Sequence, residues 1–233
     1  MMSARHPLIL IPGLLCNHKL WTYQRDALEK LTSIIFADIT GVDSIENMAL
    51  KILDNAPQKF DLAGLSMGGY VALEIMRIAP DRVNKLVLLN TTYREVSTAT
   101  ITDRLRAIEL AKAGLFAKLL AETIGQCYAA SNKSNTKILK LDKEMALEVG
   151  PEVYIQQQTA IMNRRSYADI LPLIRNPTLI IAGEEDEITP PQHSVEMAGS
   201  LYNAKLVVLK DCGHISTFER PREVTEEMTA FLR

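Results

Sequence analysis

The sequence is poor in cysteine, and its three cysteines, Cys16, Cys127 and Cys212, lie far apart in the chain. None has the spacing to another cysteine or to a histidine that a metal site requires. An odd number of cysteines without a secretion signal indicates reduced thiols and a cytoplasmic location. Each cysteine is most simply interpreted as a small apolar core residue. We therefore expect no bound metal.

Long hydrophobic runs are also missing from the sequence. No apolar segment approaches the roughly 20 residues that span a bilayer. Residues 8–16 are apolar and follow Arg5, as in a secretion signal, but Pro12 and Gly13 interrupt the run and no cleavage site of small residues follows. We expect this segment to form a core strand, and we expect no association with a membrane.

Charge of neither sign dominates the sequence. The chain has 26 Lys and Arg against 28 Asp and Glu, a formal net charge of −2, and its basic residues form no cluster. A nucleic-acid partner is therefore not expected. No glycine-rich phosphate-binding loop is present, so we expect no cofactor. With 233 residues, 47% of them hydrophobic, the chain can bury one sizeable core, as a monomer or a homodimer.

Apolar runs of strand length alternate with segments of helical periodicity over most of the chain. The expected strands are residues 7–11, 34–37, 60–63, 85–89, 178–182 and 205–209, and the first helix is expected over residues 18–31. The strand-like runs lack regular polar alternation, which indicates that helices cover both faces of the sheet. This alternation predicts an α/β fold with a doubly wound, mostly parallel sheet of about six strands.

One long segment interrupts this alternation. From residue 91 to about residue 175 no convincing strand occurs, and apolar residues recur instead at helical spacing. Residues 138–163 are predicted to form two helices, broken at Gly150 and Pro151. We therefore expect residues 91–175 to be a helical cap, inserted into a core made of residues 1–90 and 176–233.

Residues 62–69 read Leu-Ala-Gly-Leu-Ser-Met-Gly-Gly, so that Ser66 lies between Gly64 and Gly68. The expected strand before Ser66 and the helical residues 70–79 after it force a sharp turn at the serine. Only small neighbours fit such a turn, which explains the two glycines. The turn exposes the hydroxyl, and the N-terminus of the following helix favours negative charge beside it. Ser66 is therefore a candidate nucleophile.

A serine nucleophile needs a base, and the chain has four histidines. His6 precedes the first expected strand, and His18 and His193 open helices. Only His214 follows the last expected strand. Because parallel strands end at a common edge of the sheet, His214 and Ser66 can meet there, and the imidazole can accept the hydroxyl proton.

Three segments of the chain together resemble the α/β-hydrolase family. They are residues 64–70 (Gly-Leu-Ser-Met-Gly-Gly-Tyr), 182–190 (Ala-Gly-Glu-Glu-Asp-Glu-Ile-Thr-Pro) and 211–221 (Asp-Cys-Gly-His-Ile-Ser-Thr-Phe-Glu-Arg-Pro). They follow the family's order of nucleophile, acid and histidine, and the resemblance covers essentially the whole chain. The resemblance implies a Ser–His–Asp triad, without a cofactor.

The carboxylate that orients His214 is expected in the acidic loop after the fifth strand. Four acidic residues follow one another there, Glu184 to Glu187. The family spacing, Gly-x-x-Asp with a proline shortly after, selects Asp186. Glu185 remains the main alternative.

The resemblance also implies an oxyanion hole made of backbone N–H groups. One donor is Met67, the residue after the nucleophile, and the other is Leu14, in the loop after the first strand. Many relatives have His-Gly where this chain has Pro12-Gly13. Leu15 therefore remains an alternative to Leu14.

The residues that contact the substrate are harder to predict. Arg164 and Arg165 are candidates for binding a substrate carboxylate, although a solvated helix end also explains them. Trp21 is expected to be a packing residue. Several large side chains of the cap fit a pocket but fit the core better: Tyr93, Phe116, Tyr128, Met162 and Tyr167.

The favoured function is a serine hydrolase that cleaves small esters or lactones through an acyl-enzyme. The main alternative is a triad-dependent lyase or synthase, or a carbon–carbon bond hydrolase, acting on a small carboxylated substrate. The third is a non-catalytic receptor that retains the triad. Labelling with a fluorophosphonate and product analysis would separate these functions.

Overall fold

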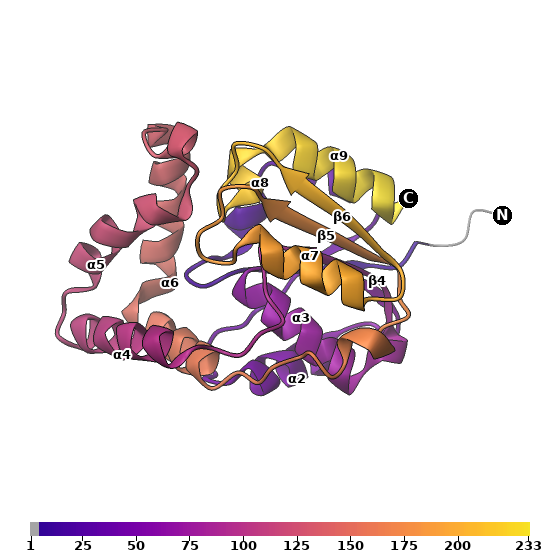
Figure 1. Ribbon diagram of the computed structural model, residues 1–233, viewed down its shortest axis with the longest axis horizontal. Helices are drawn as coiled ribbons and strands as arrows, with labels where there is room; N and C mark the ends of the chain where they lie inside the picture. The colour runs from indigo at the N-terminus through magenta and orange to yellow at the C-terminus, as the bar shows by residue number, and fades with distance from the viewer. Residues whose placement is uncertain (1–4) are drawn as a thin grey trace.

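The computed structural model describes residues 5–233, and its centre is a six-stranded sheet (Figure 1). The strands are β1 (Leu8–Ile11), β2 (Ile34–Phe36), β3 (Phe60–Leu65), β4 (Val83–Leu89), β5 (Thr178–Gly183) and β6 (Ala204–Leu209). They lie in the order β2-β1-β3-β4-β5-β6, and every neighbouring pair is parallel. The predicted doubly wound, parallel sheet is confirmed.

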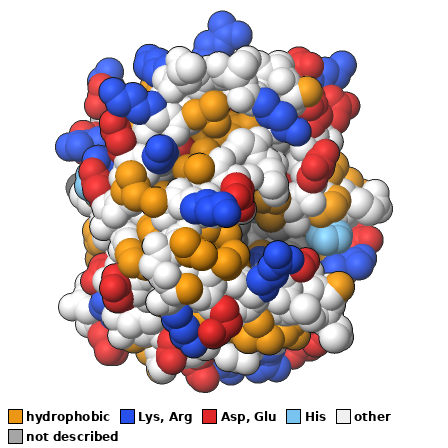
Figure 2. All heavy atoms as spheres, turned by 90° about the vertical axis from the view of Figure 1, so that its left-hand side faces the viewer, with side chains coloured by type: hydrophobic (Ala, Val, Ile, Leu, Met, Phe, Trp, Pro, Cys, Tyr) orange, Lys and Arg blue, Asp and Glu red, His pale blue; other side chains and the backbone are white. Residues whose placement is uncertain are grey.

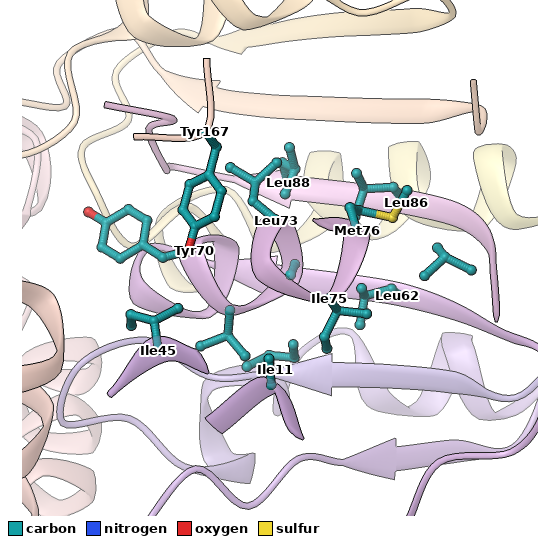
Figure 3. Close-up of a cluster of buried hydrophobic side chains, with 14 of the residues drawn as sticks. Ile11, Ile45, Leu62, Tyr70, Leu73, Ile75, Met76, Leu86, Leu88 and Tyr167 are labelled. Carbon is teal, nitrogen blue, oxygen red and sulfur yellow. The ribbon is translucent and has the colours of Figure 1, made fainter. Parts of the chain in front are cut away.

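One face of the sheet is covered by α2 (Ile45–Asn55), α3 (Met67–Ile78) and α7 (Pro191–Ser200). In Figure 3, Leu73 of α3 packs among strand residues such as Leu88, and both side chains are fully buried. Each large apolar side chain buried in this way contributes roughly 1.5–3 kcal/mol. This packing holds α3, and with it the turn that carries Ser66, firmly against the sheet.

The opposite face of the sheet packs against α8 (Ser216–Glu219), α9 (Pro221–Leu232) and the short helices that follow β1. Successive strand residues point to opposite faces, so Leu62 joins the first core and Ala63 the second. This two-sided burial explains why the strand sequences show no polar alternation.

The prediction of one continuous helix over residues 18–31 is wrong. A 3₁₀ helix (His18–Trp21) and α1 (Arg25–Glu29) stand in its place. Gln24, at the junction, is fully buried, and its side-chain amide donates to the Thr217 carbonyl at 3.1 Å. This contact with a distant part of the chain fixes the junction.

Three α-helices occupy the chain between β4 and β5: α4 (Thr98–Lys112), α5 (Phe116–Thr123) and α6 (Thr136–Met162). In Figure 1 they stand together to one side of the sheet. α6 is interrupted at Gly150, whose φ of 83° is not helical, at the position where the sequence predicted a break. No strand occurs in this part of the described chain, in agreement with the sequence pattern.

These three helices have a small hydrophobic interior of their own, centred on Phe116, Leu120 and Tyr154. Figure 2 looks onto this side of the molecule, where basic and acidic side chains are interspersed around hydrophobic ones. Such a mixed surface is unlike the continuous basic face that binds nucleic acid. Among residues 5–233, no helix combines the length and the apolar character that crossing a membrane requires.

Candidate active site

Ser66 occupies the turn between β3 and α3 in a strained backbone conformation, with φ 54° and ψ −117°. A positive φ is uncommon for any residue other than glycine and is often found at functional sites. Two hydrogen bonds to β4 and the loop after it hold the turn. The Ser66 N–H donates to the Leu89 carbonyl at 2.9 Å, and the Thr91 hydroxyl donates to the Ser66 carbonyl at 2.8 Å.

Gly64 and Gly68 are required by the close approach of the backbone at this turn. A Cβ atom on Gly64 would overlap the backbone of Gly68, and a Cβ atom on Gly68 would overlap the carbonyl of Ile11 in β1. Any larger residue would push α3 away from the sheet. The reason inferred from the sequence, that only small neighbours fit, therefore has a direct structural basis.

His214 reaches Ser66 from the loop after β6. Its Nε2 atom lies 2.7 Å from the Ser66 Oγ atom, and the residue is only 5% exposed. The His214 backbone N–H donates to the Cys127 carbonyl at 2.7 Å, which fixes the loop. His193 opens α7 and lines a different cavity.

Asp186 follows β5 and lies on the other side of the imidazole. Its two carboxylate oxygens are 3.0 and 2.9 Å from the His214 Nδ1 atom. This arrangement favours the tautomer with a proton on Nδ1, which leaves Nε2 free to accept the Ser66 proton. The alternative, Glu185, lies elsewhere, and its Oε2 atom accepts from the Ala130 N–H at 2.9 Å.

The Asp186 carboxylate is surrounded by further donors. The Asn90 amide donates at 3.0 Å, the Thr189 hydroxyl at 2.8 Å, and the backbone N–H groups of Ile188 and Thr189 at 2.9 Å. Burial by itself would raise the pKa of this carboxyl, but His214 and the hydrogen bonds outweigh burial and lower the pKa to about 2. Asp186 is therefore ionised at any pH at which an imidazole is neutral.

Two backbone N–H groups beside the serine are available to an oxyanion. Met67 is the first residue of α3, and the first N–H groups of a helix have no partner within it. Leu14 lies in the loop after β1, which packs against the turn: a Cβ on Gly13 would lie 3.4 Å from the serine Cβ. The Leu15 N–H instead donates to Gln157 Oε1 at 2.9 Å. Neither the Leu14 nor the Met67 N–H has an acceptor within the described chain.

A cavity of about 530 Å³ opens beside Ser66 and His214. Its walls come from the loops at the carboxyl edge of the sheet and from α4, α5 and α6. Much of the lining is aliphatic, from Leu14, Leu119, Leu120, Ile124, Ile161 and Ile188. The volume falls within the range of small-molecule sites in proteins.

None of the five large cap residues considered from the sequence lines this cavity; Tyr93, Phe116, Tyr128, Met162 and Tyr167 all lie outside its lining. Trp21 is fully buried in the core, as expected of a packing residue. Arg165 is at the surface, 3.5 Å from Asp169. The side chains of α4 and α6 that do line the cavity include Arg104 and Tyr154, which the sequence did not single out. Helical spacing identifies an apolar face but not what that face contacts.

The cysteines near the site carry neutral thiols. Burial, followed by the charge of Asp142, raises the pKa of Cys16 well above its usual value and the pKa of Cys127 to about 12. Burial likewise raises the pKa of Cys212. A protonated thiol is a poor nucleophile and a poor metal ligand. Over residues 5–233, no cluster of three His, Cys, Asp or Glu residues is placed to hold a metal ion.

A parallel sheet of this order, with a serine at the strand–helix turn and a histidine after the last strand, is the architecture of an α/β-hydrolase. Residues 6–221 match the family described as alpha/beta hydrolase fold, and the chain belongs to this family. The resemblance inferred from the sequence is confirmed.

Proteins similar to the chain include two esterases and an enol-lactonase. It is 25% identical, over 233 residues, to the pimeloyl-[acyl-carrier protein] methyl ester esterase of Nitrosomonas europaea, with 93% of this chain and 91% of the relative covered. A thermophilic esterase from Thermogutta terrifontis superimposes with a TM-score of 0.89 at 28% identity, covering 99% of this chain and 90% of that one. The enol-lactonase from Burkholderia xenovorans LB400 shares the fold, with a TM-score of 0.88 at 23% identity and coverage of 99% and 92%.

Proposed function

We propose that this protein is a serine hydrolase that cleaves small carboxylic esters or lactones through an acyl-enzyme. The observation that carries the proposal is the line of contacts from Ser66 Oγ to His214 Nε2, at 2.7 Å, and from His214 Nδ1 to Asp186, at 2.9 Å. The similarity to two esterases supports ester cleavage over other reactions of the fold.

In the proposed mechanism, His214 accepts the Ser66 proton at Nε2 while the serine oxygen attacks the ester carbonyl. Asp186 stabilises the imidazolium that forms. The N–H groups of Leu14 and Met67 donate to the oxyanion of the tetrahedral intermediate. His214 then protonates the leaving alcohol, and a water molecule activated by the same imidazole hydrolyses the acyl-enzyme.

The test of this function is labelling of the serine combined with product analysis. A fluorophosphonate should label Ser66, and a small methyl ester should yield methanol and the free acid in equal amounts. An unsaturated product, or cleavage of a carbon–carbon bond in place of the ester, would favour the lyase or carbon–carbon hydrolase alternatives. Absence of both labelling and turnover would favour a receptor.

We further propose that residues 91–175 act as a cap on a core made of residues 1–90 and 176–233. Support comes from the cavity, because Leu119 of α5 and Ile161 of α6 line it together with Ser66. A cap in this position limits the size of the substrate and excludes water from the reacting atoms.

The size of the cavity predicts an acyl-chain limit. We expect kcat/KM on p-nitrophenyl esters to fall once the acyl chain exceeds about eight carbons, because a cavity of about 530 Å³ holds only a small ligand. A series from acetate to palmitate measures this limit. Rates that continue to rise up to emulsified triglycerides would contradict it.

Enlarging the cavity from the cap side should shift this limit. Leu119 is 8% exposed and lines the cavity, so Leu119→Ala should move the preferred acyl chain longer by about two carbons. The matched control is Leu105→Ala on α4, where the side chain is 50% exposed. Melting temperatures of both variants are needed, since a buried Leu→Ala change costs about 2–5 kcal/mol. A folded Leu119→Ala enzyme with the wild-type chain profile would reject the proposed role of the cap.

A further inference from the structure

The cavity beside Ser66 contains a guanidinium with an unused hydrogen-bonding edge. Arg104, on α4, lines both this cavity and an adjoining one. Its Nη1 atom donates to Gln158 Oε1, whereas its Nε atom is buried and has no partner within residues 5–233. No ion pair in this part of the chain includes Arg104.

A partly buried cation without a counter-ion is unfavourable, and the groups around Arg104 add to this effect. Burial lowers the pKa of Arg104, and the nearby Arg164 lowers it further, opposed only by Tyr70 and Tyr154. Arg104 and Arg164 also line the adjoining cavity together, so two cations lie at this end. A buried charge of this kind is normally paired, so the missing partner points to an anionic ligand.

The acidic residues that line the same cavity do not supply that partner. Asp142 is buried on α6 and accepts a hydrogen bond from the Tyr128 hydroxyl at 2.8 Å. Asp103 and Glu187 are exposed. None of the three forms an ion pair with Arg104, and none is among the groups that shift the pKa of this arginine.

The position of Tyr70 relates this cationic end to the nucleophile. Tyr70 lies four residues after Ser66 on α3, which corresponds to roughly 6 Å along a helix. It lines both cavities, and in Figure 3 its hydroxyl end points away from the other labelled side chains. Arg164 lies over the Tyr70 ring, 4.4 Å from its centre. Ser66, Tyr70 and Arg104 therefore line one cavity, the same cavity that a small ester reacting at Ser66 would occupy.

We propose that Arg104 binds a carboxylate at the far end of the substrate, so that the preferred substrates are half-esters of small dicarboxylic acids or lactones that carry a carboxylate. The Nε–Nη2 edge of a guanidinium matches the two oxygens of a carboxylate. This inference rests on the proposed function, because it names the substrate class of the same site. It assigns the role to Arg104 in place of Arg164 and Arg165, the two arginines considered from the sequence.

A single negative charge fits this site better than a phosphate dianion. Arg164, the second cation, already donates to the backbone carbonyls of Arg94 and Ile161, at 3.1 and 3.2 Å. No hydrogen bond within residues 5–233 uses Nε or Nη2 of Arg104, whereas Arg164 already uses its Nε, so Arg104 keeps its two-pronged edge whole. One guanidinium balances one carboxylate.

The test compares kcat/KM for monomethyl adipate and dimethyl adipate, which differ in one negative charge. The ratio of kcat/KM for the monoester to kcat/KM for the diester should be at least about ten in wild type. Arg104→Met should reduce this ratio by about 10- to 100-fold, as expected for hydrogen bonds to a charged group. Arg106→Met, an exposed position on the same helix, should keep the wild-type ratio. Arg104→Lys keeps the charge without the two-pronged edge, so its ratio should lie between those of wild type and Arg104→Met.

Fluorophosphonate labelling of Ser66 in every variant separates the possible failures. If wild type is labelled and cleaves dimethyl adipate without preferring the monoester, the inference is wrong and the proposed function stands. The same holds if labelled Arg104→Met and Arg104→Lys both keep the wild-type ratio. A preference for an ester with a terminal phosphate over monomethyl adipate would also overturn the carboxylate assignment. If Ser66 of wild type is not labelled, the proposed function fails and the inference fails with it.

Discussion

Replacing Ser66 by alanine is expected to lower kcat/KM for ester cleavage by about 10⁴- to 10⁶-fold, as the loss of the nucleophile does in serine hydrolases. Without Oγ no acyl-enzyme can form, and the remaining donors only polarise the substrate carbonyl. The turn should survive, since alanine is no larger than serine and the two hydrogen bonds that hold the turn use the backbone of Ser66 and not its side chain.

The measurement is turnover of a preferred small ester, together with the melting temperature and fluorophosphonate labelling. Ser131→Ala, at an exposed position of a short 3₁₀ helix (Ala130–Asn132) in the proposed cap, is the matched control and should behave as wild type. A folded Ser66→Ala protein that kept wild-type turnover would exclude the serine mechanism altogether.

The strands could be predicted from the sequence because a parallel sheet is buried on both faces. Each strand then appears as a short apolar run, and these six runs match the six observed strands within about two residues. The candidate site could also be predicted in outline. Ser66, Asp186 and His214 all follow such runs, and parallel strands deliver such residues to one edge.

What the sequence could not reveal depends on contacts between distant residues. The break in the first predicted helix requires the contact of Gln24 with Thr217, which lies 193 positions further along the chain. Arg104 belongs to a helix with a weak apolar face, and only the fold brings it to a cavity beside Ser66. Periodicity describes one helix at a time and contains no information about such partners.

The hydrogen-bond donors around Asp186 could not be predicted from the sequence for the same reason. Thr189 lies inside the acidic segment that resembles the family, and Asn90 directly follows a predicted strand at the carboxyl edge of the sheet. A polar residue at that position was the available signal. Its role could not be inferred from this signal, because the role depends on how the loop after β5 folds. In the structure the Asn90 amide reaches both Asp186 and the Gly213 carbonyl, at 3.0 Å each.

Replacing Asp186 by asparagine is expected to lower kcat by about 10⁴-fold, the effect seen where an amide replaces the acid of a triad. Every group within hydrogen-bonding distance of the carboxylate acts as a donor toward it: His214 Nδ1, the Asn90 amide, the Thr189 hydroxyl and two backbone N–H groups. An amide NH₂ placed there must face one of these donors. If it faces Nδ1, the imidazole takes the wrong tautomer and Nε2 can no longer accept the Ser66 proton.

Glu185→Gln is the matched control for this substitution, because it makes the same chemical change one residue away. The Glu185 carboxylate accepts from the Ala130 N–H and does not contact His214, and an amide oxygen can accept the same bond. We expect this variant to lose less than about tenfold in kcat, since no contact to the imidazole changes.

A pH profile of kcat for the wild type adds a second measurement. Because the pKa of Asp186 is lowered to about 2, the profile should show no step from this carboxyl near its ordinary pKa of 3.8. If Glu185→Gln were crippled and Asp186→Asn were active, the acid would have to be reassigned to Glu185, and the contacts of 2.9 and 3.0 Å to Nδ1 would have no catalytic role.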